Sequence, residues 1–349
     1  HWIYSVEYQE YSPGFDVNDA GFLGSTDMRS IAPIIGYNET KPSKHFRNWL
    51  QFLYWNPTWD FDHNLTFNGL GALTIAELPD FWDYRLRFDW RPSSFDPTLL
   101  RGGPVARLTQ GGDVQLNVAT DRRKSYQGTL FGSFSWNVAG GRGVNLQPGM
   151  TMRPSTAIKL TLAPTYSWTH ALAQYVTVSP DPLATATYGS RYVFANLEQK
   201  QLALVTRVDW TFTPTLSLQL FAQPLLAAGD FHNFKQFLKP RAFEFGVYGK
   251  NLGTISRDAS GVYTVDPDGS GPANTFQFGD PDFNERSLRG NAVLRWEYRP
   301  GSALFFVWQQ SRSGFIQDGQ FDFSRDFDAL SNLQPQNVFV IKGTWWIGR

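Results

Sequence analysis

Between Phe81 and Pro92 the sequence reads Phe-Trp-Asp-Tyr-Arg-Leu-Arg-Phe-Asp-Trp-Arg-Pro. Apolar and charged side chains alternate here, so an extended chain would carry two unlike faces. One face holds Trp82, Tyr84, Leu86, Phe88 and Trp90, and the other holds Asp83, Arg85, Arg87, Asp89 and Arg91. A run of about ten residues is the length of a tilted strand that crosses a bilayer. The stretch therefore predicts a strand of a closed barrel, with lipid outside and a polar lumen inside.

The same alternation recurs along the chain, at 65–75, 114–118, 158–169, 202–221, 291–299 and 339–347. In the first of these segments Leu73 and Ile75 follow the apolar phase and Thr74 follows the polar one, so we expect both apolar side chains to face lipid. A soluble strand would need a second layer to cover its apolar face, and the sequence offers no helices to supply one.

Two kinds of connection alternate between these segments. Short breaks occur at 40–43, 78–80, 121–124, 153–155, 213–215 and 299–302, and longer connections rich in Gly, Asp and Pro occur at 11–26, 57–63, 93–111, 137–143, 178–190, 229–285 and 314–336. Outer-membrane barrels have short periplasmic turns and long extracellular loops. The sequence therefore predicts an all-β fold, a transmembrane antiparallel up-and-down β-barrel of about 14 strands with long extracellular loops.

Two further strand-like runs, at 241–248 and 261–265, leave an alternative open. If they formed an additional barrel hairpin, the barrel would have about 16 strands, an even number as bacterial barrels require. We expect instead a hairpin that projects from the 229–285 connection, because the alternative needs an unusually long periplasmic turn.

The composition fits a barrel and excludes some other classes. Mean hydropathy is -0.33 and aromatic residues make up 16% of the chain, with 13 Trp. A barrel strand averages a lipid face and a water face, and its aromatic residues gather at the membrane interfaces. The net charge is +0, with 31 basic and 31 acidic residues, so no strong field attracts nucleic acid. Cysteine is absent, as suits an oxidising envelope compartment.

No catalytic or metal-binding motif stands out. The five His are His1, His45, His63, His170 and His232, and none lies in a spacing such as HExxH. A Gly-x-Ser-x-Gly nucleophile elbow is also missing. The sequence therefore predicts no enzyme and no cofactor, and an outer-membrane hydrolase is the least favoured reading.

The charged phase of the strands predicts the residues that line the lumen. They are Arg47, Asp83, Arg85, Arg87, Asp89, Arg91, Lys159, Arg207, Asp209, Arg295, Glu297 and Arg299. In a channel such groups line water and bias the permeant. In an occluded barrel they pair with opposite charges on neighbouring strands. We also expect Trp49, Trp55 and Trp346 to point inward, where they could stack on sugar rings.

Two motifs carry a resemblance to a known family. Tyr11-Ser-Pro-Gly-Phe-Asp-Val-Asn-Asp-Ala-Gly-Phe22, and Arg295-Trp-Glu-Tyr-Arg-Pro-Gly-Ser302 with Val307-Trp-Gln-Gln310, resemble the C-terminal barrel of large bacterial outer-membrane proteins. That barrel is a domain of unknown function that follows an N-terminal domain similar to family 9 carbohydrate-binding modules. The resemblance implies that residues 1–349 form a single outer-membrane β-barrel domain, and that an N-terminal periplasmic or carbohydrate-binding domain is absent from this sequence.

Two functions follow as expectations. The barrel is either a transport conduit for small polar solutes, such as oligosaccharides captured by the absent domain, or an anchoring scaffold of a larger envelope assembly with an occluded lumen. Its expected partners are outer-membrane lipid, oligosaccharide and other envelope proteins, with no nucleic acid. The expected location is the outer membrane of a diderm bacterium.

Overall fold

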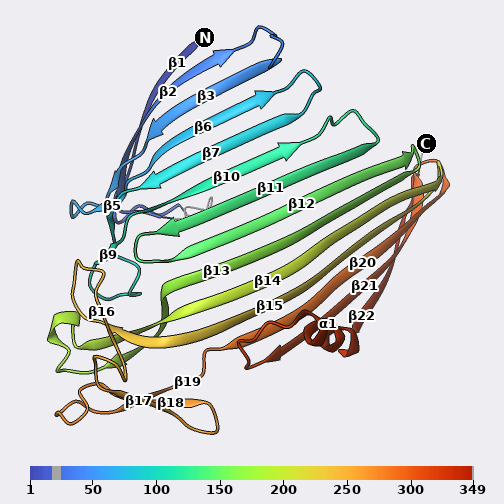
Figure 1. The fold of residues 1–349 in the computed structure, drawn as a ribbon. Helices are drawn as coiled ribbons and strands as arrows, with labels where there is room; N and C mark the ends of the chain where they lie inside the picture. The colour runs from blue at the N-terminus through green and yellow to red at the C-terminus, as the bar shows by residue number, and fades with distance from the viewer. Residues whose placement is uncertain (18–24, 348–349) are drawn as a thin grey trace.

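The computed structural model describes residues 1–17 and 25–347, so part of the 11–26 connection and of the first family motif lies outside the described residues. The main sheet is antiparallel and has 17 strands. Most of them form a meander in which each strand pairs with the next in the chain (Figure 1). These are β1 (Trp2–Tyr11), β2 (Met28–Glu39), β3 (Asn48–Trp55), β6 (Leu70–Glu77), β7 (Asp83–Arg91), β10 (Gly111–Ala119), β11 (Tyr126–Asn137), β12 (Arg142–Ser155), β13 (Ile158–Pro180), β14 (Ser190–Thr213), β15 (Leu216–Phe237), β20 (Phe283–Arg299), β21 (Ser302–Ile316) and β22 (Gln336–Thr344).

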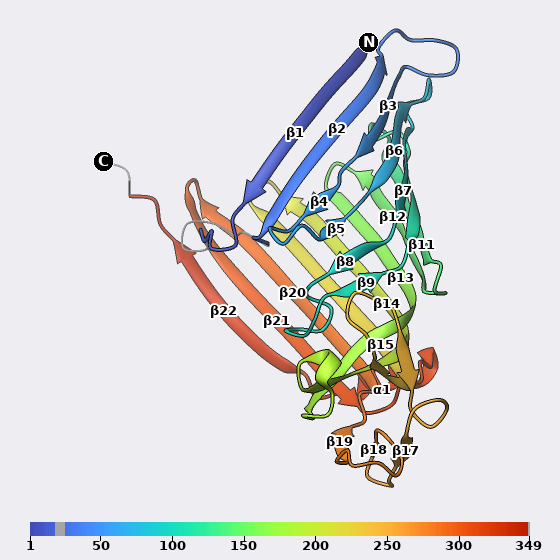
Figure 2. The ribbon, with the colours of Figure 1, turned by 90° about the vertical axis from the view of Figure 1, so that its left-hand side faces the viewer.

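Three short strands complete the sheet: β4 (Thr58–Trp59), β5 (Leu65–Phe67) and β16 (Phe245–Val247). Within the described residues, β1 pairs only with β2, and β22 pairs only with β21. The short strand β4 pairs with β2, and β5 pairs with β4. The sheet therefore has two free long edges, β1 and β22. Figure 2 shows the sheet curled, with these two edge strands on the same side of the molecule. The all-β antiparallel prediction is confirmed, and no backbone pairing among residues 1–17 and 25–347 closes the curl.

The predicted short and longer connections lie at opposite ends of the strands (Figure 1). The predicted longer connection at 137–143 is in fact a short turn between β11 and β12. Each predicted short break lies at or directly beside the turn between two neighbouring strands of the meander, as at 299–302 between β20 and β21. The run at 241–248 contributes β16, which pairs with the end of β15. The run at 261–265 falls in β18 (Val262–Asp266), which pairs with β17 (Thr254–Arg257) and β19 (Phe276–Gly279) in a separate small sheet. Two further short strands, β8 (Ser94–Asp96) and β9 (Ala106–Leu108), pair within the 93–111 connection.

The expectation of a chain without helices is wrong at one place. Helix α1 (Phe323–Asn332) lies in the 314–336 connection, and a 3-10 turn, η1, covers Thr185–Thr187. The Asp322 side chain accepts the backbone N–H of Arg325 and so caps α1. An Asp at this position is a sequence signal for a helix start, and the strand periodicity on either side masked it.

Strand register assigns every side chain to one of two faces. Leu86 lies opposite Leu116 on β10, and Arg87 lies opposite Gln115. We call the Arg87 side the inner face and the Leu86 side the outer face. On the inner face Asp89 and Asp113 are only 4% and 7% exposed, whereas on the outer face Leu86 is 47% exposed. The predicted polar and apolar faces of β7 are therefore confirmed.

The register of β3 and β6 corrects two predictions. Thr74 lies opposite Leu86, and Leu73 lies opposite Arg87, so Leu73 is on the inner face and not on the outer one. Ile75 shares that inner face. Trp49 and Trp55 lie opposite Ala76 and Leu70, which places both Trp on the outer face. The reason is that β3, Asn-Trp-Leu-Gln-Phe-Leu-Tyr-Trp, is apolar in both phases and gives no alternation to follow.

The tightly packed core lies at the long-loop end. Strands β13, β14 and β15 extend beyond their neighbours, and loops pack on them in two clusters. One cluster joins Leu100 and Ala106 to Tyr192, Phe194 and Phe237. The other joins Val193, Ala195 and Phe234 to Tyr248 and Val265, with the small β17–β19 sheet against it. The loop end is therefore a folded layer rather than a set of independent connections.

Candidate functional site: the inner face and its loop cover

A linked group of charged side chains occupies the inner face of β3, β7 and β10. The Tyr54 hydroxyl donates to Asp89 Oδ1 at 2.6 Å and accepts from Arg87 Nε at 2.9 Å. Arg87 Nε also lies 2.5 Å from Asp89 Oδ2. Tyr54 can reach across the sheet because Gly71 lies between it and Asp89, and a Cβ at Gly71 would come within 2.2 Å of the Tyr54 ring.

The next rung of this group crosses from β7 to β10. Arg91 Nη1 donates to Asp113 Oδ1 at 2.6 Å, and Gln115 Nε2 donates to Asp113 Oδ2 at 2.9 Å. Both carboxylates of the group are thus buried and held by arginines. The Arg91–Asp113 pair joins neighbouring strands, as expected for an occluded barrel, whereas Arg87 and Asp89 pair within β7. Buried charges need partners, whereas a selective pore needs charges of one sign.

The other predicted inner-face residues are divided between a second group and the turns. Lys159 lies opposite Asp209 on neighbouring strands, and the Arg207 guanidinium lies 5.3 Å from the centre of the Phe221 ring. Arg207 and Asp209 line a cavity of about 370 Å³ with Gln219 and Asn291. Arg295 Nη2 is 2.6 Å from Glu297 Oε2 in the same strand.

Several predicted residues lie at the short-turn end, away from both groups. Arg47 precedes β3, pairs with Glu77 at 2.9 Å and covers the Phe81 ring. Asp83 lies 3.5 Å from Arg122, and Arg299 Nε donates to Ser302 at 3.3 Å in the β20–β21 turn. Trp346 follows the end of β22, is 69% exposed, and its backbone N–H donates to Ser302 Oγ. Arg85 lines a cavity with Arg87, Gln115, Asn117 and Phe131.

A loop bridge spans the long-loop end, and no strand pattern indicated it. We give this name to the contacts between residues 93–111 and 238–245. The backbone N–H of Arg241 donates to Val105 O at 2.7 Å, and that of Arg107 donates to Ala242 O at 3.1 Å. Arg241 Nη1 also donates to Asn64 Oδ1 at 2.5 Å, in the connection between β3 and β6. The bridge therefore ties the N-terminal strands to the extended strands β13–β15.

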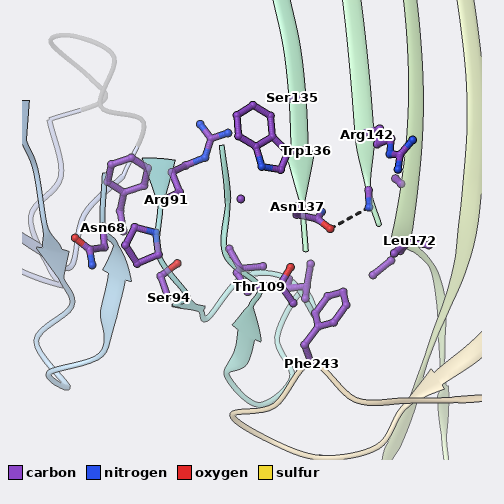
Figure 3. A pocket seen from close by; sticks show the side chains of 18 of the residues that line it. Asn68, Arg91, Ser94, Thr109, Ser135, Trp136, Asn137, Arg142, Leu172 and Phe243 are labelled. Atoms are coloured by element: carbon purple, nitrogen blue, oxygen red, sulfur yellow. Dashed lines mark hydrogen bonds between the residues drawn. The ribbon is translucent and has the colours of Figure 1, made fainter. Parts of the chain in front are cut away.

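A pocket of about 470 Å³ lies beneath the loop bridge (Figure 3). Leu99, Leu108 and Phe243 of the bridge line one side, and the short β11–β12 turn, with Asn137, lines another. The register places Ser135 on the inner face and Trp136 on the outer face. Because the lining includes residues of both faces, the pocket lies at the end of the β11–β12 hairpin, between its turn and the loop bridge. Sequence periodicity could not find it, because its lining combines strands and connections that are far apart in the sequence.

A half-buried carboxyl, that of Asp282, supports the loop layer next to β20. Asp282 Oδ1 accepts the backbone N–H of Phe231 at 2.7 Å. Burial is the main cause that raises the pKa of Asp282 to about 6, with smaller contributions from the carboxylates of Asp280 and Asp230. Arg257 opposes this rise.

This carboxyl predicts a pH dependence of the loop layer. The pKa of Asp282 in the folded protein lies above the ordinary value of 3.8, so protonation of this carboxyl stabilises the folded loop layer. The stability of the loop layer therefore falls as pH rises from about 4 to about 6. Limited proteolysis of the 238–282 segment should therefore slow several-fold between pH 7 and pH 5. Asp282→Asn should be resistant at both pH values, and an unchanged pH response in that variant would contradict this assignment.

The comparisons with known proteins give a family and no function. None of the helices in the described residues is long and apolar enough to cross a membrane. No curated protein and no solved structure shows significant similarity to the chain. Residues 1–348 match the family model of a domain of unknown function, DUF5916, and the chain therefore belongs to that family.

Proposed function

We propose that the chain is a membrane-spanning β-barrel of a bacterial outer membrane, which serves as a transport or anchoring module with a covered mouth. One observation carries the membrane assignment: the outer face exposes large apolar side chains on strand after strand. The exposed fractions are 47% for Leu86, 38% for Leu116, 41% for Trp210, 40% for Phe306 and 71% for Ile341. So large a continuous apolar surface would not stay in water, and only helices and closed barrels satisfy the backbone inside lipid.

In this proposal the long strands of the meander cross the membrane. Leaving β4, β5 and β16 out of the 17 strands gives fourteen, with the first and the last running antiparallel. Pairing of β1 with β22 would close the curl and remove both free edges, as lipid requires. The short turns then face the periplasm and the long connections, including 229–285, face the exterior.

The interior supports a barrel with at most weak, poorly selective conductance. Arg87 pairs with Asp89 and Arg91 pairs with Asp113, so these inner charges are balanced in pairs. The loop bridge crosses the mouth above them. Transport of small polar solutes would require the bridge to move, whereas a scaffold would keep it in place. Trp49 and Trp55 lie on the outer face, and Trp346 lies at the short-turn end beyond β22, so oligosaccharide as a permeant rests on the family resemblance alone.

Planar-bilayer recording distinguishes the covered barrel from an open porin. We expect small currents from the full chain and a several-fold larger conductance when residues 97–105 are replaced by a short Gly-Ser linker, because that change removes the Val105 contact and the Leu100 packing. The matched control is the same replacement at 268–273, in the exposed β18–β19 connection away from the bridge. Large, steady, ion-selective currents from the unaltered chain would contradict the covered barrel and favour a dedicated porin.

A further inference from the structure

Helix α1 is fixed to the outer face of the sheet by buried charges. Asp326 is 0% exposed, and its carboxylate lies 3.2 Å from Arg286 Nη2 and accepts from Asn284 Nδ2 at 3.0 Å. On β20, Asn284 and Arg286 lie opposite Ala228 and Leu226 of β15, which continue the outer phase of Leu202 and Lys200. The helix therefore lies outside the curled sheet, on the surface that carries the exposed apolar side chains.

The helix runs across the strands and not along them. Before it, Gly319 packs on the backbone of Asp230, in the half of β15 nearer the long loops. Asp326 then sits over Arg286 of β20, and Leu333 covers Gly314 of β21, where a Cβ would come within 2.9 Å of the Leu333 side chain. The axis of α1 is thus tangential to the sheet. In a membrane-spanning barrel this direction is parallel to the bilayer surface.

The handedness of the sheet shows which way each flank of α1 points. The N–H of Thr211, an inner-face residue on β14, donates to Ala157 O beside β13. For L-residues this puts β13 to the right of β14, viewed from outside with the long loops uppermost, so successive strands run from right to left. Helix α1 runs leftward in this view. An α-helix is right-handed, with 3.6 residues per turn, so its side chains advance clockwise when viewed from its N-terminus. Because the buried side chains of α1 face the sheet, the side chains next to them in the clockwise direction point down, toward the short turns.

The two flanks of α1 differ in chemistry. The downward flank carries Phe323 and Phe327, which are 52% and 45% exposed and stack with ring centres 5.7 Å apart. The upward flank carries Arg325, which bonds to Asp318 at 2.6 Å and to the Gln320 carbonyl at 2.5 Å. Two exposed aromatic rings are therefore aimed at the apolar outer face, and the charged residue is aimed at the loops.

We propose that α1 is an interfacial anchor whose Phe323 and Phe327 enter the acyl region of the outer leaflet. The inference rests on the proposed membrane-spanning barrel and adds a specific contact with lipid. Lipid is the occupant because the Phe pair continues the exposed apolar outer face and because the helix lies tangentially at its long-loop end. Amphipathic helices that lie in the membrane plane bury one apolar flank just below the headgroups.

Site-specific labelling tests the anchor directly, since the chain contains no cysteine. Full-length Phe327→Cys carries a polarity-sensitive fluorophore and is reconstituted in phosphatidylcholine vesicles with a nitroxide quencher on the acyl chains. The matched control is Asp328→Cys, which is exposed on the polar side of the same helix. Leu86→Cys reports whether the barrel spans the membrane at all. Heat-modifiable migration in gels shows that each variant has folded.

We expect strong quenching at positions 86 and 327 and at least several-fold weaker quenching at 328. Strong quenching at 86 with equally weak quenching at 327 and 328 would overturn the anchor while leaving the barrel intact. Equal strong quenching at 327 and 328 would also overturn it, because the helix would then have no oriented lipid flank. Absence of quenching at 86 in folded protein would overturn the proposed barrel itself.

Discussion

Arginine in place of Leu86 is expected to destabilise the folded protein in lipid by about 2–4 kcal/mol. Leu86 lies on the outer face, directly opposite Leu116, in the middle of β7. In the proposed barrel, a charged side chain at this position would lie near the centre of the bilayer, far from water, which is energetically costly. Urea titration of heat-modifiable migration in lipid or detergent micelles measures the change.

The control for this variant is Ser133→Arg, on the inner face of β11 between Gln115 and Asn145. An inner-face arginine remains among polar groups, so it should cost less than about 1 kcal/mol. Equal losses from Leu86→Arg and Ser133→Arg would show that the two faces do not differ in their surroundings, and would count against a lipid-facing outer surface.

Removal of the Asp326 carboxylate is expected to cost about 3–5 kcal/mol, because it leaves a buried guanidinium without its counter-ion. The side chain of Arg286 is 8% exposed and that of Asp326 is 1% exposed. In Asp326→Ala we therefore expect α1 to detach and the 314–336 connection to become sensitive to protease well before the strands unfold. Cleavage rates mapped by mass spectrometry would measure this.

Asp328→Ala is the matched control, since Asp328 is an exposed acidic residue two positions along the same helix. It should change stability by no more than about 0.5 kcal/mol. If Asp326→Ala left protection of the connection unchanged, the buried pair would not be what holds α1 on the outer face.

Where one polar phase was clear, sequence reasoning predicted correctly which side chains share a face of the sheet. Arg87 and Asp89 share a face as their spacing predicted, and the structure shows them paired. The prediction failed for Trp49 and Trp55 because β3 is apolar in both phases. On the inner face of β3, Tyr54 crosses Gly71 to bond with Asp89, a contact between separate strands that periodicity does not encode.

The loop bridge and the position of α1 on the sheet could not be predicted from local sequence patterns. Arg241 bonds with Asn64, 177 residues away, and the contact depends on how the whole sheet curls. An Asp at position 322 could have indicated the start of α1, but only the pairing of Asp326 with Arg286 shows which face of the sheet it covers.

The sequence by itself determined the strand grammar of this protein: period-two alternation, the order of short turns and long loops, and hence an antiparallel meander. These features depend on neighbours along the chain, where the alternation of side chains and the chemistry of turns are local. The tertiary structure alone decided the faces of β3 and β6, the partners of the buried carboxylates, the loop bridge and the outward seat of α1. Each of these depends on residues brought together by the curl of the sheet, and local periodicity carries no record of such contacts.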